Sequence, residues 1–140
     1  MGSAFITICF ECDACLILQK ALFKCVYIRN VMIQEKYKKA VDKFVKITLD
    51  KHRDKIDGII LFGSVAREEA REDSDIDIIL IVNDDSFKMQ KLISEVVVKI
   101  LFETEIYVSA KVISSEEYNL LKEINSSFYR DVVREGVLIG

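Results

Sequence analysis

The chain has 140 residues, of which 51% are hydrophobic and 31% are charged, with no proline and a formal net charge of −3. This length and composition predict a single globular domain with a real hydrophobic core, and they exclude a disordered or low-complexity chain. The negative net charge also argues against a broad basic surface that grips nucleic acid, so we expect no strong nucleic-acid binding.

The first 31 residues differ in character from those that follow. They contain the apolar run SAFITICFECDACLIL, which is interrupted by Glu11 and Asp13 and has no basic residue ahead of it. The run is too short and too charged for a membrane span, and it lacks the basic start of a signal peptide, so we expect no membrane association. Met32 stands just before the first well-patterned helix. This favours an N-terminal extension, appended or mis-started, over residues 1–31 and a functional domain over residues 32–140.

All four cysteines lie in this extension, at Cys9, Cys12, Cys15 and Cys25, and their spacing includes two overlapping C-x-x-C steps. Such steps suit thiolate ligands, so a zinc site is one interpretation. The other is that the thiols are free. No further cysteine follows, and His52 is far off in the sequence, so the pattern favours a reducing compartment and a cytoplasmic protein.

Hydrophobic periodicity after Met32 predicts alternating helices and strands. Ser86 is a plausible N-cap, and Ser114 with Glu117 forms a capping-box pattern. Gly136 is a plausible helix stop. The expected elements are a helix over 34–52, a strand over 58–62, a short helical segment over 65–72, a strand over 75–82, a helix over 86–102, a strand over 105–113, helices over 114–124 and 127–134, and a last short strand over 137–139. This order predicts an α/β (α+β) fold, a small mixed sheet with helices packed on it.

Two carboxylates stand at the start of the most apolar of these strands. Asp75 and Asp77 are two residues apart, so their side chains project from the same face of an extended strand, with Cα atoms roughly 7 Å apart. Left unpaired near an apolar interior, they would repel each other and resist desolvation. A bound Mg²⁺ resolves both problems, and paired carboxylates that hold metal ions are what phosphoryl or nucleotidyl transfer requires.

The Gly63-Ser64 pair follows the preceding strand. A glycine lets the backbone approach a ligand closely, while backbone N–H groups and the serine hydroxyl can hold phosphate oxygens at the start of a short helix. A Gly-Ser pair alone indicates only a loop, and an isolated Asp-x-Asp indicates a solvated strand entrance. In this order and at this spacing, we expect the two to form a phosphate site beside a metal site.

Gly63-Ser64, ten intervening residues and Asp75-Ile76-Asp77 resemble the signature of the DNA polymerase β-like nucleotidyltransferase superfamily, in particular its minimal nucleotidyltransferase (MNT) branch. The resemblance covers about Ile56 to Ile139, including FYRDVVREGVLI near the end of the chain. It implies the nucleotidyltransferase fold, Mg²⁺ and a nucleoside triphosphate donor, commonly ATP.

In that family the Gly63-Ser64 pair would bind the triphosphate, and Asp75 and Asp77 would hold the metals as catalytic residues. Arg67 falls where many members carry an arginine, either as a phosphate contact or as a solvent-facing loop residue. Many members have glycine next, where this chain has Glu68.

Superfamily enzymes often carry a third carboxylate on the later strand, as a general base or metal ligand for the acceptor. The best match to that position in this chain is Lys111, with Ser109 and Tyr107 on the same face. The sequence therefore predicts an intact donor half of the site and leaves open whether catalysis survives.

Stand-alone domains of this kind resemble the antitoxin of toxin–antitoxin pairs, whose partner is a HEPN-domain ribonuclease that the antitoxin can adenylylate on tyrosine. We therefore expect transfer of AMP from ATP to a hydroxyl of a HEPN-domain partner. Two alternatives remain. One is a binding module that neutralises the toxin without turnover, which Lys111 favours, and the other is a small-molecule nucleotidyltransferase completed by oligomerisation.

Overall fold

The computed structural model describes residues 34–140, so the predictions for the N-terminal extension, its cysteines and a zinc site lie outside the described residues. The elements are α4 (Glu35–His52), the 3-10 turn η1 (Arg53–Lys55), β1 (Ile56–Phe62), α5 (Gly63–Ala66), β2 (Ile76–Val82), α6 (Ser86–Thr104), β3 (Val108–Ser114), α7 (Ser115–Glu123), α8 (Ser127–Glu135) and β4 (Val137–Leu138).

The strands form a four-stranded sheet in the order β3-β2-β1-β4. Strand β1 pairs antiparallel with both β2 and β4, whereas β2 and β3 are parallel and are connected through α6. A parallel pair needs such a crossover, while an antiparallel pair needs only a short connection. The predicted small mixed sheet is confirmed.

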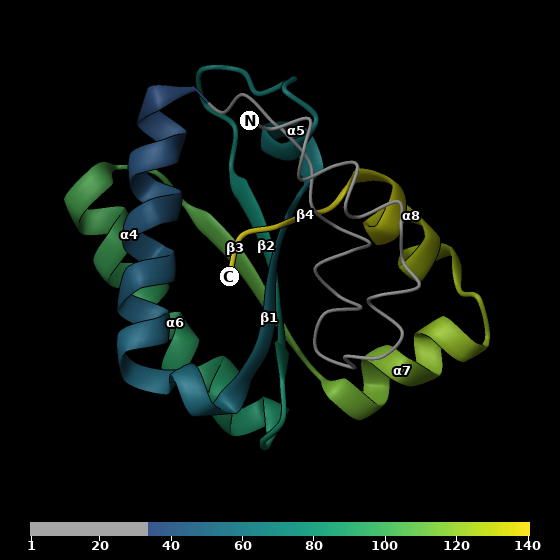
Figure 1. Ribbon diagram of the computed structural model, residues 1–140. Coiled ribbons are helices and arrows are strands. Elements are labelled where there is room, and N and C mark those ends of the chain that lie inside the picture. The colour runs from purple at the N-terminus through teal and green to yellow at the C-terminus, as the bar shows by residue number, and fades with distance from the viewer. Residues whose placement is uncertain (1–33) are drawn as a thin grey trace, which may run out of the picture.

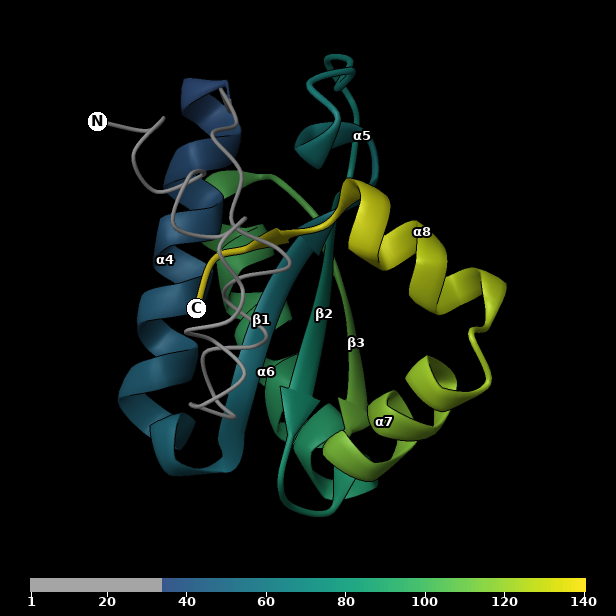
Figure 2. The ribbon, with the colours of Figure 1, turned by 45° about the vertical axis from the view of Figure 1, so that its right-hand side comes forward.

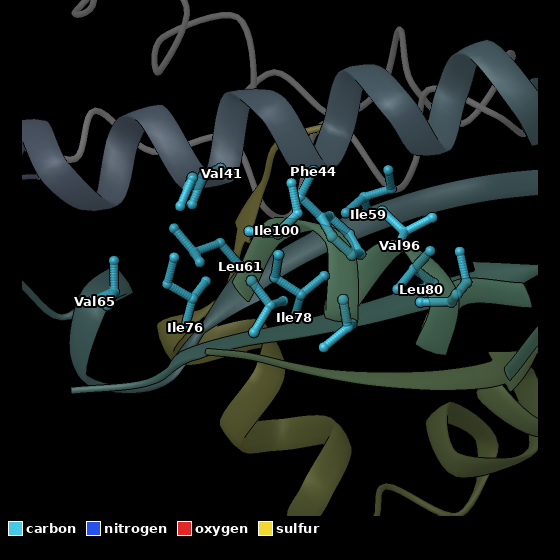
Figure 3. Close-up of a cluster of buried hydrophobic side chains, with 14 of the residues drawn as sticks. Val41, Phe44, Ile59, Leu61, Val65, Ile76, Ile78, Leu80, Val96 and Ile100 are labelled. Atoms are coloured by element: carbon cyan, nitrogen blue, oxygen red, sulfur yellow. The ribbon is translucent and has the colours of Figure 1, made fainter. Parts of the chain in front are cut away.

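Helices cover both faces of the sheet. In Figures 1 and 2, α4 and α6 lie on one face, and α7 and α8 lie on the other. The apolar faces of β2 explain this arrangement, because Ile76, Ile78, Leu80 and Val82 pack in the core under α4 and α6, and Ile79 and Ile81 pack in the core under α7 and α8. Figure 3 shows the first of these cores, with Phe44 of α4 and Ile100 of α6 directed at the side chains of the sheet.

The predicted helical segment over 65–72 is wrong beyond its first turn. Helix α5 ends at Ala66, and Glu68 adopts a left-handed backbone with φ of 62°. Residues 67–75 carry many charged side chains and few apolar ones that could anchor a helix to the core. They form a loop instead, and the left-handed residue lies at the position where many family members have glycine.

Two other boundaries differ from the prediction. The N-cap of α6 is Asp85 rather than Ser86, and its carboxylate accepts hydrogen bonds from the N–H groups of Phe87 and Lys88. Strand β3 begins at Val108 rather than Glu105, because Glu105 ends α6 in a left-handed conformation. The predicted cap at Ser114 is confirmed, since its hydroxyl accepts from the N–H of Glu117.

No helix between residues 34 and 140 is long and apolar enough to cross a membrane.

Candidate active site

The sheet brings Gly63 and Asp77 together at one of its ends. Because β1 and β2 run antiparallel, the last residue of β1, Phe62, pairs with Asp77. Helix α5 therefore begins beside the start of β2, and both views place it at that end of the sheet (Figures 1 and 2). In the sequence, Ser64 and Asp75 are eleven positions apart. In space, the Gly-Ser pair and the Asp-x-Asp pair are neighbours, as predicted.

Gly63 and Asp77 touch directly. Gly63 has φ of +77°, and a Cβ added there would lie 2.3 Å from Oδ2 of Asp77. The positive φ favours glycine because a side chain strains that backbone conformation, and the short distance requires glycine because no Cβ fits there. The backbone at Gly63 thus lies against one side of the Asp77 carboxylate and limits the directions from which that carboxylate can bind a ligand.

Asp75 and Asp77 have different environments. Asp75 is exposed in the segment just before β2, whereas Asp77 is half-buried within the strand. Burial raises the pKa of Asp77, the negative charge of Asp75 raises it further, and the positive charge of Arg67 opposes both. The two acids therefore form a site of concentrated negative charge that a cation would stabilise.

Ser64 lies within the first turn of α5, half-buried. The first N–H groups of a helix have no partner within that helix, so they are available to an anion together with the serine hydroxyl. The carbonyl groups of this turn are already used, since the N–H of Arg67 donates to the carbonyl of Gly63 and that of Glu69 to the carbonyl of Ser64. These N–H groups and the Ser64 hydroxyl are the candidate donors to phosphate oxygens, and the phosphate site stays a prediction.

Arg67 lies just after α5 and is partly exposed. Its Nε donates to Oε2 of Glu69 at 3.0 Å, and its Nη1 donates to Oε2 of Glu135 at 3.1 Å. The arginine is therefore held by two glutamates, and the sequence reasoning missed Glu135. A pair 68 residues apart leaves no periodic signal in the sequence.

The loop that carries Asp75 is anchored to the start of α4. Three carbonyl groups of the loop accept hydrogen bonds from side chains of that helix and its N-cap, and the Tyr37 side chain is almost fully buried. The donors Gln34, Lys36 and Tyr37 pair with the carbonyls of Ala70, Glu72 and Arg71, respectively. These contacts were not predicted, because the helix was identified only from its apolar face.

The position beside Asp77 on β3 is Ser109. The parallel register pairs Asp77 with Ser109 and Ile79 with Lys111. This corrects the expectation that Lys111 occupies the place of a third carboxylate; its Nζ lies 5.0 Å from the centre of the Phe128 ring, where it makes a cation–π contact. Within residues 34–140, no three His, Cys, Asp or Glu side chains gather as a metal site.

Known proteins resemble this chain in sequence. Residues 43–139 match the family described as polymerase beta, nucleotidyltransferase. A Methanocaldococcus jannaschii protein named "putative protein adenylyltransferase" is 43% identical over 98 residues, which are 70% of this chain and 92% of that protein. The crystal structure of a "putative nucleotidyltransferase" from Sulfolobus solfataricus covers 76% of this chain and 87% of its own, with a TM-score of 0.45 and 17% identity. The family match spans more than half of the chain, which therefore belongs to the polymerase β nucleotidyltransferase family.

Proposed function

We propose that this nucleotidyltransferase moves AMP from ATP, with Mg²⁺, to a hydroxyl group of a partner protein. The observation that carries the proposal is the seating of the Asp77 carboxylate against Gly63 with Asp75 two residues away. This geometry puts a carboxylate pair and a phosphate-binding turn at one point. A relative that is 43% identical and named a protein adenylyltransferase supports AMP as the transferred group and a protein as the acceptor.

The carboxylate pair fits Mg²⁺. Carboxylate oxygens are the ligands that Mg²⁺ prefers, and it is commonly held by one or two of them together with substrate phosphates and water. Burial raises the pKa of Asp77 and the charge of Asp75 raises it further, so a bound cation would stabilise the ionised pair. Asp75 and Asp77 would hold the metal. When bound, Mg²⁺ supplies charge neutralisation for the triphosphate and polarises the attacking and leaving oxygens.

The chain's own residues would bind and orient the donor. The N–H groups of α5, the Ser64 hydroxyl and Arg67 would hold the triphosphate with its α-phosphorus next to Asp77. The acceptor oxygen attacks that phosphorus, the bond to pyrophosphate breaks, and pyrophosphate leaves. Because Ser109 stands beside Asp77 on β3, we propose that a group of the partner protein or water takes the acceptor proton.

The acceptor is proposed to be a HEPN-domain ribonuclease, for which this chain would act as the cytoplasmic antitoxin. The support is the resemblance of Gly63-Ser64 and Asp75-Ile76-Asp77 to the minimal nucleotidyltransferase signature, together with the name of the relative.

A second candidate is a binding module that neutralises the toxin by forming a complex without transfer. The observation that favours it is Ser109 in register with Asp77, with no carboxylate at that place on β3. A serine hydroxyl is a poor general base, so turnover would be slow or absent.

Co-expression with the proposed HEPN-domain toxin separates the two candidates. Asp75→Asn combined with Asp77→Asn should abolish protection from the toxin, while co-purification of the two proteins remains. The control is Asp50→Asn, which removes an exposed carboxylate near the end of α4 and should leave protection intact. Full protection by the double variant would contradict transfer and support neutralisation by binding alone.

A further inference from the structure

Glu135 lies at the end of α8 and reaches the phosphate-binding turn from a distant part of the chain. Its Oε2 accepts from Nη1 of Arg67, and its side chain is 27% exposed. In both views the junction of α8 and β4 lies next to α5 (Figures 1 and 2). Arg67 holds the pKa of the Glu135 carboxyl below its ordinary value, so the glutamate is the anionic partner of this pair.

The backbone around Glu135 is fixed by close packing. A Cβ on the next residue, Gly136, would lie 2.4 Å from the carbonyl oxygen of Val132 and 2.8 Å from Cγ2 of Ile60. Directly afterwards β4 pairs with β1, with Val137 opposite Leu61. Glu135 therefore lies just before β4, and β4 pairs with β1, the strand that leads into Gly63. The sheet thus sets the position of Glu135 relative to the site.

The second partner of Arg67 lacks such support. Glu69 is only two residues from Arg67, its side chain is 65% exposed, and it belongs to the same loop. An ion pair between two residues of one loop moves with that loop. Glu135 thus provides the contact that ties the guanidinium to the sheet.

We propose that Glu135 is a positioning residue that holds the Arg67 guanidinium beside Asp77, ready to bind the polyphosphate of the donor. This inference rests on the proposed function. Nε and Nη1 of Arg67 donate to Glu69 and Glu135 and hold the group in place, so Nη2 is the nitrogen that would meet a phosphate oxygen. A pre-oriented guanidinium binds phosphate without first losing side-chain freedom.

Charge alone predicts the opposite effect. Glu135 and Glu69 each place a negative charge near the polyphosphate, so removing either one should tighten nucleotide binding if they act only through electrostatics. If Glu135 positions Arg67, its removal should weaken binding, whereas removal of Glu69 should not. The two glutamates therefore form a matched pair, because both substitutions remove one carboxylate from the same guanidinium.

The test compares Glu135→Gln with Glu69→Gln. The first readout is the equilibrium Kd, by calorimetry with Mg²⁺, of an ATP analogue whose α–β bridging oxygen is replaced by methylene. The second is the KM for ATP in AMP transfer. We expect Glu135→Gln to raise Kd and KM about two- to fivefold, the range that an ion pair of this exposure supplies, with little change in kcat. Glu69→Gln should have a smaller effect or none.

Two controls identify the route of the effect. Glu123→Gln removes an exposed carboxylate at the end of α7 and should change neither constant. In an Arg67→Ala background, Glu135→Gln should not weaken binding further, because its partner is already absent. The proposal would be overturned if Glu135→Gln weakened nucleotide binding equally in the Arg67→Ala background, or if it tightened binding in the otherwise wild-type protein. Failure of the wild-type protein to bind the analogue would instead count against the proposed function.

Discussion

At residue 63 only a glycine hydrogen fits against the carboxylate of Asp77. Gly63→Ala would force a left-handed backbone on a residue with a side chain and would drive its Cβ into Oδ2. We expect a loss of roughly 2–5 kcal/mol in the free energy of unfolding, from the backbone and overpacking penalties together, and displacement of Asp77. Urea unfolding and nucleotide binding measure the two effects.

The matched control for Gly63→Ala is Gly58→Ala in β1. Its backbone is outside the left-handed region, and a Cβ there would meet only Cδ1 of Leu138 at 3.6 Å, an ordinary contact. This variant should unfold near the wild-type denaturant concentration. If both glycine variants behaved alike, the close approach of Gly63 to Asp77 would not be a constraint on the fold.

Asp77 makes the folded state less stable than a neutral residue would at this position. Its pKa is raised by burial and by Asp75, so the folded protein binds its proton more tightly than the unfolded chain does. Stability therefore increases as pH falls through the raised pKa, and the penalty is absent below the ordinary aspartate pKa of 3.8. Asp77→Asn should raise Tm at neutral pH, with a gain that disappears in acid.

The control for this effect is Asp50→Asn, which removes an exposed carboxylate of α4 and should leave the pH dependence of Tm unchanged. Mg²⁺ should raise Tm for the wild-type protein and have little effect on Asp77→Asn, because the cation relieves the same repulsion. A lower Tm for Asp77→Asn at neutral pH would show that the carboxylate stabilises the fold, contrary to this account.

The helices and strands differ in how far the sequence predicts them. The two faces of β2 follow from its alternating pattern, and the helix over 34–52 follows from its apolar spacing, since both signals are local. Boundaries set by backbone conformation were missed: Glu68 and Glu105 adopt positive φ, to which no side-chain pattern points. The late start of β3 is one consequence of the conformation of Glu105.

The sequence also does not predict the parts of the site that depend on pairing between distant elements. Gly63, Ser64, Asp75 and Asp77 belong to one hairpin-like unit, so their proximity could be predicted from spacing. The register of β3 against β2, which puts Ser109 beside Asp77, depends on a crossover through α6 and has no local signal. The same is true of the contact between Arg67 and Glu135, which joins two ends of the domain.

At the scale of the whole molecule, the mixed sheet collects these separate segments at one end. The end of β1 and the starts of β2, β3 and β4 meet there, because β1 runs opposite to β2 and β4 while β3 is parallel to β2. The two helical layers pack on the two faces of the sheet, and α5 lies at this end of it (Figure 2). The layers thus provide the stability, and the sheet end provides the chemistry.

Asp75, Asp77 and the turn at Gly63-Ser64 are proposed to form an active site for AMP transfer. The most direct test is incubation of the purified protein with α-labelled ATP and Mg²⁺, with and without the proposed HEPN-domain partner, followed by detection of label on protein. We expect label on the partner with the wild-type protein and none with Asp77→Asn. Binding of ATP without any transfer, or equal labelling by Asp77→Asn, would contradict the account.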